Sequence, residues 1–252
     1  MLRVEGLSHH FGGVEALVEL DLQIAKGDVV GLIGPNGSGK TTLLNVITGV
    51  YKPASGRIRF QDREISGLEP HEIISFGIAR TFQNLRIYKR MTVSDNVWGA
   101  QHSLPGVSLK ELFLAPSEKK CPHREEIERL LELVGLAERR DTLAQNLTLQ
   151  DQRRLELARA LARSPELLLL DEPAGGMTPV ETEKMAALIR DVALPGRTCV
   201  IIEHKMNMIS DLCSRICVLN FGRKIAEGRP DDVLRQPRVL EAYLGTEGMA
   251  HA

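Results

Sequence analysis

Short apolar runs of strand length alternate along the chain with segments whose apolar residues recur at helical spacing. Residues 29–33, 167–170 and 198–202 are apolar throughout or nearly so, which is typical of strands buried on both faces. Residues 57–60 alternate between arginine and apolar side chains, as a half-exposed strand does. Strands that alternate with helices indicate an α/β fold with a largely parallel sheet.

Three helices are expected between these strands. Residues 39–50 carry apolar side chains at helical spacing, and residues 153–163 form a helix that Pro165 stops. A third helix begins at Thr178, an N-cap residue type followed by a proline and an acidic first turn, and runs to Pro195.

Residues 85–150 differ from the rest because chain-breaking residues are followed there by a strongly helical stretch. Pro105 and Pro116 interrupt the segment, and Gly135 stands where a helix C-cap is expected. Before that glycine, one apolar stripe at helical spacing comprises Ile127, Leu130, Leu131 and Val134. We interpret this region as a helical insertion between two parts of the α/β core.

Composition excludes several classes of protein. The 252 residues are 43% hydrophobic and 26% charged, which is ordinary for a globular chain. The net charge of −1 provides no excess positive charge for nucleic acid, so no nucleic-acid partner is expected. No apolar run approaches the ~20 residues that span a bilayer, and no secretory signal is expected at the N-terminus.

Four scattered cysteines argue against a zinc site and a disulfide framework, because none stands in a CxxC pair. Cys199 and Cys217 lie in apolar runs and are expected to be small buried side chains.

A phosphate-binding motif follows the first buried strand. Residues 34–41 fit GxxxxGK[ST], in which glycines let backbone N–H groups face a phosphate at a helix N-terminus. Lys40 is expected to reach the β- and γ-phosphates, and the Thr41 hydroxyl to ligate Mg²⁺. The nucleotide-binding residues predicted here are Gly34, Pro35, Asn36, Gly37, Ser38, Gly39, Lys40, Thr41 and Thr42.

Two carboxylates end the buried strand 167–170. Asp171 and Glu172 stand at the carboxyl end of that strand, where open α/β sheets bind ligands. Asp171 is expected in the Mg²⁺ shell, and Glu172 is placed to polarise a water for attack on the γ-phosphate. Together with the phosphate-binding motif, this pair indicates a P-loop NTPase.

The order of motifs resembles the nucleotide-binding subunit of ABC transporters over essentially the whole chain. After Lys40 come Gln83 in RTFQN, the stretch LTLQDQRR at residues 147–154, the pair Asp171-Glu172, and His204 at the end of a buried strand. The resemblance implies a P-loop NTPase fold with a mostly parallel core sheet, an antiparallel β subdomain and an inserted helical subdomain.

The resemblance also implies a domain division. Residues 1–252 would form a single ABC ATPase domain. Its α/β core with the β subdomain would comprise about residues 1–84 and 156–252, and the helical insertion with the signature region about residues 85–155.

Further roles follow from the resemblance alone. It implies that Gln83 touches Mg²⁺ or the attacking water and that His204 reaches the γ-phosphate and orients that water. Phe11 matches the aromatic residue that stacks on adenine, although by itself it would be interpreted as core. Thr148, at the signature position, would bind the ATP of the opposite subunit.

Longer stretches are similar to those of the ATPases of branched-chain amino acid importers. These stretches are FGGVEAL, IARTFQNLRIYKRMTVSDNV, IIEHKMNMI and VLEAYLG. In such systems two different ATPase chains pair beneath two permease chains on the cytoplasmic face of the inner membrane, and a periplasmic binding protein delivers the substrate. The resemblance therefore implies a peripheral subunit. Urea/amide importers share much of the pattern and are the alternative substrate class.

A soluble ABC ATPase that drives assembly, as in iron–sulfur cluster maturation, is the alternative from another class. The stretch around Gln83 favours the importer, because in the family that region contacts the permease.

The signature position departs from the family's LSGGQ. Thr148 replaces serine, and Leu149-Gln150 replaces two glycines, so Gln150 adds a Cβ atom where the backbone must approach phosphate. Thr178 also replaces the acidic residue or asparagine usual after Glu172. We hypothesise an asymmetric dimer whose better hydrolytic site is at this chain's P-loop; the alternative is that Thr148 and the helix dipole suffice.

Overall fold

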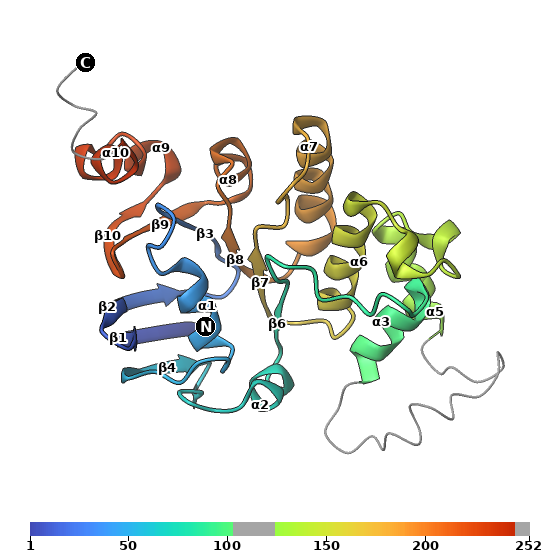
Figure 1. Ribbon diagram of the computed structural model, residues 1–252, viewed down its shortest axis with the longest axis horizontal. Coiled ribbons are helices and arrows are strands. Elements are labelled where there is room, and N and C mark those ends of the chain that lie inside the picture. The colour runs from blue at the N-terminus through green and yellow to red at the C-terminus, as the bar shows by residue number, and fades with distance from the viewer. Residues whose placement is uncertain (103–123, 245–252) are drawn as a thin grey trace.

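Two β-sheets and the helices around them make up the structure, a computed structural model that describes residues 1–102 and 124–244 (Figure 1). The larger sheet has the strand order β10-β9-β3-β8-β7-β6. Its strands are β3 (Val29–Ile33), β6 (Ile78–Arg80), β7 (Leu167–Asp171), β8 (Thr198–Ile202), β9 (Arg215–Asn220) and β10 (Arg223–Gly228). All pairings are parallel except that of β9 with β10, which confirms the largely parallel sheet.

The smaller sheet is antiparallel and has the order β2-β1-β4-β5. Its strands are β1 (Leu2–Phe11), β2 (Val14–Ile24), β4 (Ser55–Phe60) and β5 (Arg63–Glu64). In β4 the apolar Ile58 and Phe60 are buried while Arg57 and Arg59 are exposed, as the alternation predicted.

Helix α1 (Lys40–Ile47) lies between the two sheets, and a hydrophobic core joins all three. Leu43 and Leu44 of α1 pack there with residues of β1, β2, β4 and the larger sheet. The helix is shorter than residues 39–50, because the chain turns at Gly49, whose φ is 74°. Helix α1 is therefore held in place by packing against both sheets.

A second core covers the other face of the larger sheet. The helices on this side are α6 (Leu149–Leu161), α7 (Pro179–Leu188), α8 (Met206–Leu212), α9 (Pro230–Val233) and α10 (Pro237–Leu244). Thr178 and Glu181 form a capping box at the start of α7, which confirms the predicted N-cap, and the helix continues as a π-helical turn at Ile189–Ala193.

A third hydrophobic cluster is formed by helices in the middle of the sequence. Its elements are α3 (Val93–His102), α5 (Arg124–Leu133), part of α6, and the 3₁₀ turn Ala144–Asn146, while a further 3₁₀ turn, Ala137–Arg139, contributes no buried side chain. The predicted apolar stripe lies in this cluster, and Gly135 has the C-cap conformation with a φ of 71°. A separate short helix, α2 (Pro70–Ser75), precedes β6.

Helix α6 belongs to two hydrophobic clusters at once. Leu155 and Ala158 pack in the third cluster, whereas Leu157 and Leu161 pack in the second. The helix begins at Leu149, four residues before its predicted start, because Thr148 caps it by accepting a hydrogen bond from the backbone N–H of Asp151. One rigid helix therefore connects the middle helices to the core.

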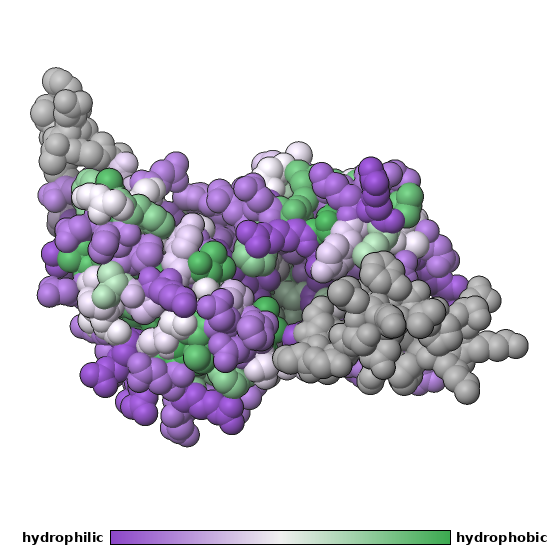
Figure 2. Space-filling view, turned by 60° about the horizontal axis from the view of Figure 1, so that its bottom comes forward, coloured by the Kyte–Doolittle hydropathy of each residue, from purple (hydrophilic) through white to green (hydrophobic). Residues whose placement is uncertain are grey.

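The surface and the thiols fit a folded globular chain. On the face in Figure 2, apolar residues are scattered in patches among hydrophilic ones, and among the described helices none is long and apolar enough to cross a membrane.

Cys199, Cys213 and Cys217 are free and buried, as expected for Cys199 and Cys217, and burial raises the pKa of each thiol to about 12. Cys121, Pro105 and Pro116 lie outside the described residues.

Gly31 in β3 gives a test of the packing between the larger sheet and the second core. A Cβ atom there would lie 2.9 Å from Ile216, 3.1 Å from Ile209 and 3.2 Å from Cys213. We expect Gly31→Ala to lower the free energy of unfolding by about 1–3 kcal/mol, measured by urea denaturation, since overpacking strains a close-packed core.

Gly13→Ala is the matched control, because a Cβ atom there meets nothing within 4 Å and its φ is not in the left-handed region. It should change the stability by less than about 0.5 kcal/mol. Equal effects of the two substitutions would contradict the packing assignment.

Candidate functional site

The loop between β3 and α1 can form only with glycine at two positions. A Cβ atom at Gly34 would lie 2.1 Å from the carbonyl oxygen of Leu219, and one at Gly39 would lie 2.5 Å from that of Ala16. Both residues also have positive φ, 147° and 102°. The loop is thus held against β2 and β9, and the structure brings the predicted phosphate-binding residues together at the N-terminus of α1.

Lys40 and Ser38 carry polar groups that suit a phosphate ligand. The Lys40 ammonium is buried and donates to the carbonyl oxygens of Gly34 at 2.8 Å and Pro35 at 2.9 Å. Burial lowers its pKa, which the nearby Glu172 and Asp171 counteract. The Ser38 hydroxyl is buried and has no hydrogen-bond partner among the described residues. A buried cation and an unsatisfied hydroxyl at a helix N-terminus fit a bound phosphate.

Thr41 and Thr42 follow Lys40 in the first turn of α1 and are half-buried. Asn36 and Gly37, in the middle of the loop, are exposed. This places the Thr41 hydroxyl on the same turn as the lysine, as the motif predicts.

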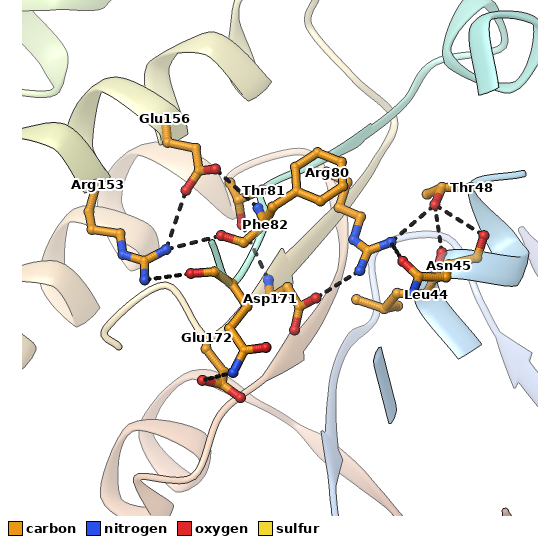
Figure 3. A network of polar contacts seen from close by, with 11 residues as sticks. Leu44, Asn45, Thr48, Arg80, Thr81, Phe82, Arg153, Glu156, Asp171 and Glu172 are labelled. Atoms are coloured by element: carbon orange, nitrogen blue, oxygen red, sulfur yellow. Dashed lines mark hydrogen bonds and ion pairs between the residues drawn. The ribbon is translucent and has the colours of Figure 1, made fainter. Parts of the chain in front are cut away.

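Asp171 is buried at the end of β7 and paired with an arginine that the sequence reasoning did not select. One oxygen of Asp171 accepts from Arg80 at 2.8 Å, and these two side chains are 1% and 4% exposed. Arg80 also donates to Asn45 of α1 and to Thr48, the residue that caps the end of that helix (Figure 3). Its only sequence signal is its place three residues before Gln83, at the end of β6.

The second carboxylate oxygen of Asp171, Oδ1, is buried without a hydrogen-bond partner among the described residues. Burial raises the pKa of Asp171, and the Arg80 guanidinium counteracts this. An unsatisfied carboxylate oxygen close to a phosphate site fits a divalent cation, since hard cations prefer oxygen ligands.

Three predicted residues from separate parts of the sequence meet at Glu172. The Gln83 amide donates to Oε2 of Glu172 at 3.1 Å, and Nε2 of His204 lies 3.0 Å from Oε1. Because an ionised carboxylate only accepts, His204 is the donor in that hydrogen bond. Glu172 also has a φ of 50°, a left-handed conformation that is strained for a residue with a side chain.

Residues on either side of His204 hold the loop that follows Glu172. The buried Glu203 accepts from the backbone N–H of Ala174 at 2.9 Å, and Lys205 donates to the carbonyl oxygens of Ala174 at 3.1 Å and Met177 at 3.0 Å. These three hydrogen bonds tie the loop after Glu172 to the segment that carries His204. Neither residue was selected from the sequence, because the partners are backbone groups that leave no motif.

Comparison with known proteins identifies the family of the chain. Residues 17–175 match the family model described as ABC transporter, and residues 223–248 match that of the branched-chain amino acid ATP-binding cassette transporter. The chain belongs to the ABC transporter family. Its fold is accordingly the P-loop ABC fold that the sequence predicted.

Curated relatives of this ABC protein match over nearly the whole length. The high-affinity branched-chain amino acid transport ATP-binding protein LivG of Salmonella typhimurium is 39% identical over 97% of this chain and 98% of its own. The corresponding protein BraF of Pseudomonas aeruginosa is 40% identical over the same shares.

Among solved structures, the ADP conformation of the ATP-binding cassette MJ1267 superposes with a TM-score of 0.85 at 34% identity, covering 97% of this chain and 98% of that one. A nucleotide-free cassette of an ABC transporter also gives 0.85, at 35% identity, covering 97% of this chain and 99% of that one.

Phe11 of this ABC protein is a surface residue rather than part of the core. It ends β1, is 46% exposed, and packs edge-on against His9 and Tyr51 at centroid distances of 4.7 and 5.2 Å. The hairpin that carries it continues to Ala16, whose carbonyl oxygen lies against the P-loop. An exposed ring supported by two others beside the P-loop can stack on a base.

The signature position of this ABC protein is an ordinary helix start. Thr148 is exposed and its hydroxyl already caps α6, and Leu149 and Gln150 lie in the first turn with no positive φ. The Cβ atom of Gln150 therefore sits in a conformation that any residue adopts. Asp151, at the position of the usual glutamine, pairs with Arg139 and Arg154.

The C-terminal helix α10 brings one more residue to the P-loop. Partial burial raises the pKa of the Tyr243 phenol, and the neighbouring backbone of Gly34 counteracts this. The sequence gives no motif for this contact, since Gly34 and Tyr243 lie 209 positions apart in the chain.

The buried Arg80–Asp171 pair predicts a large loss of stability when only one partner is removed. We expect Arg80→Met to lower the free energy of unfolding by about 3–5 kcal/mol, because it leaves a buried carboxylate unpaired. Adding Asp171→Asn to Arg80→Met should restore part of that loss. Urea denaturation of the single and the double variant measures the free energy of unfolding of each.

Arg57→Met is the matched control, since Arg57 and Glu5 form an ion pair at 3.5 Å on the exposed face of the smaller sheet. Such exposed pairs are worth about 0–1 kcal/mol. An Arg80→Met protein as stable as this control would contradict the assigned role of the buried pair.

Proposed function

We propose that this chain is the ATP-hydrolysing subunit of an importer for branched-chain or related amino acids. The observation that carries the ATPase part is the convergence of Gln83 and His204 on the Glu172 carboxylate beside the P-loop. The substrate class is supported by the similarity to LivG and BraF over nearly the whole chain. Urea/amide importers remain the alternative substrate class.

Nucleotide binding would use the residues that the P-loop assembles. Lys40 would exchange the carbonyl oxygens of Gly34 and Pro35 for the β- and γ-phosphates, while the backbone N–H groups of residues 34–41 and the first turn of α1 face the remaining oxygens. The Phe11 ring would stack on adenine. The Thr41 hydroxyl and the unpaired Oδ1 of Asp171 would hold Mg²⁺, with Gln83 nearby. Bound Mg²⁺ would neutralise part of the phosphate charge.

Glu172 would act as the general base for the attacking water. Its strained backbone fixes the direction of the side chain, and its two oxygens are oriented by the Gln83 amide and the His204 imidazole. His204 would also donate toward the γ-phosphate when the water takes its place beside Glu172. Because the groups are already positioned, little reorganisation accompanies the reaction.

A groove beside the Gln83 loop is the proposed contact with the permease chains. It has a volume of about 510 Å³ and lies between β6 and α6. Aromatic rings with arginines stacked over them form part of its wall: Arg86 over Phe82 at 4.1 Å and Arg159 over Tyr88 at 4.6 Å. An apolar segment with acidic flanks would suit this lining. We place the subunit at the cytoplasmic face of the inner membrane, bound to two permeases served by a periplasmic binding protein.

We further propose that a different ABC ATPase subunit completes the dimer. Thr148 would face the ATP bound to that partner, and the partner's signature would close the ATP at Lys40. The absence of glycines at Leu149-Gln150 supports unequal sites. Glu172→Gln in this chain should then lower turnover of the mixed dimer more than the equivalent change in the partner, and equal losses would contradict the asymmetry.

Glu172→Gln is the central test of the catalytic assignment. We expect kcat for ATP hydrolysis to fall roughly 10³-fold or more, because the preorganised base is lost. ATP binding should persist, since the P-loop is untouched. The release of phosphate measures kcat, and equilibrium binding measures the affinity for ATP.

Glu183→Gln is the matched control, because Glu183 is an exposed carboxylate on α7. It should leave both kcat and binding unchanged. Near-normal hydrolysis by Glu172→Gln would overturn the assignment of the base.

Co-purification separates the importer from the soluble assembly ATPase. When native membranes are solubilised in mild detergent and this chain is captured, mass spectrometry should find two hydrophobic permeases and a second ATPase. Capture of soluble scaffold proteins without a membrane partner would favour the assembly role and leave the nucleotide site as assigned.

A further inference from the structure

Two buried side chains of opposite charge on α6 hold the loop that carries Gln83 (Figure 3). Arg153 donates through Nη1 to the carbonyl oxygen of Phe82 at 3.0 Å and through Nη2 to that of Gln83 at 2.8 Å. Oε1 of Glu156 accepts from the backbone N–H groups of Phe82 at 3.2 Å and Arg86 at 3.3 Å. We call Arg153 and Glu156 together the α6 clasp.

The α6 clasp is specific to main-chain groups of one short loop. Its two charges are 8% and 5% exposed and lie 3.4 Å apart, so burial is compensated by their pairing and by four backbone hydrogen bonds. The Arg153 guanidinium also lies against Gly175 in the loop after Glu172, where a Cβ atom would be only 3.2 Å away. The clasp thus contacts the loops of both residues that meet at the proposed water site.

We propose that Arg153 and Glu156 are positioning residues that couple the position of Gln83 to helix α6. The inference rests on the proposed ATPase function and adds a path by which the nucleotide site acts on the middle helices. The Gln83 side chain reaches Glu172 while its carbonyl is held by Arg153, so Gln83 moves only with α6 or by breaking the clasp. Leu155 and Ala158 of the same helix then transmit the movement to the third hydrophobic cluster.

Trp98 provides a readout of this coupling. It is the single tryptophan of the chain, lies on α3, and packs against the third hydrophobic cluster, where α3 contacts α6. A change in α6 on nucleotide binding therefore alters the surroundings of the only indole, and its fluorescence reports the helices while binding is measured separately.

The test compares wild type with Arg153→Met, Glu156→Gln and the double variant. In wild type, MgATP should change the Trp98 emission. In Arg153→Met and in the double variant, this change should be less than about half of the wild-type change. The dissociation constant for MgATP should stay within roughly threefold of wild type. Glu156→Gln keeps an acceptor oxygen for the backbone N–H groups of Phe82 and Arg86, so its Trp98 emission change should be reduced less than that of Arg153→Met. In steady-state hydrolysis, kcat should fall while KM changes little.

Hydrogen exchange tests the clasp without nucleotide. The amides of Phe82 and Arg86 donate to Glu156, so they should exchange about tenfold faster in Glu156→Ala than in wild type when each protein is folded. Glu128→Gln is the matched control, because Glu128 pairs with Arg124 and Arg140 on the exposed side of α5, at 3.0 and 3.3 Å. It should alter neither the exchange nor the Trp98 response.

The outcomes separate this inference from the proposed function. Folded clasp variants that bind MgATP and show the wild-type Trp98 response would overturn the coupling, and so would unchanged exchange at Phe82 and Arg86. A wild-type chain that neither binds nor hydrolyses ATP would overturn the proposed function instead, and faster exchange in Glu156→Ala would then still support the clasp as the support of the Gln83 loop.

Discussion

The parallel pairing of β3, β8 and β7 is the constraint on which the site depends. Leu32 pairs with Ile202, and Ile202 pairs with Asp171, so the three strands end at the same level of the sheet. The P-loop, the Asp171-Glu172 pair and His204 each follow one of these ends. Parallel strands place their carboxyl ends on one edge, and ligands of open α/β sheets bind there.

Buried charge is concentrated around this edge, and each charge is tied to backbone or to a partner. Arg80 joins Asp171 to α1, the α6 clasp holds the Gln83 loop, and Glu203 with Lys205 holds the loop after Glu172. Such groups are costly to bury unless their hydrogen bonds are satisfied. Among the buried atoms without a hydrogen-bond partner in the described residues, the Ser38 hydroxyl and Oδ1 of Asp171 lie where they fit the phosphate and the cation, and Nε of Arg80 and of Arg153 is unpartnered as well.

The helices in the middle of the sequence are connected to the site by few elements. Their own hydrophobic cluster shares α6 with the second core, and the Gln83 loop runs between them. Helix α6 is rigid, packs in both clusters and is tied to the Gln83 loop by the α6 clasp. A displacement of that loop can therefore move α6 and the helices packed against it. This arrangement gives a physical basis for the ATPase and its membrane partners to influence each other.

The sequence determined the elements and residues whose signals are local. Apolar runs predicted β3, β7 and β8, and the motif spacing predicted the P-loop and Asp171-Glu172, because strand burial and phosphate binding impose residue types on neighbouring positions. Gln83, His204 and Phe11 were found only through the order of motifs in a known family. Boundaries were less well predicted: α6 begins four residues earlier than expected, since a threonine cap has the same appearance as any surface threonine.

Only the tertiary structure decided which distant groups meet. The side chains that support the site contact backbone atoms or partners far along the chain; they are Arg80, Arg153, Glu156, Glu203, Lys205 and Tyr243. Backbone groups are the same in every residue, so a side chain that binds them leaves no complementary pattern in the sequence. Local sequence motifs therefore specify the residues that carry the chemistry of the site. The contacts that hold these residues in place form only when the strands and α6 have packed.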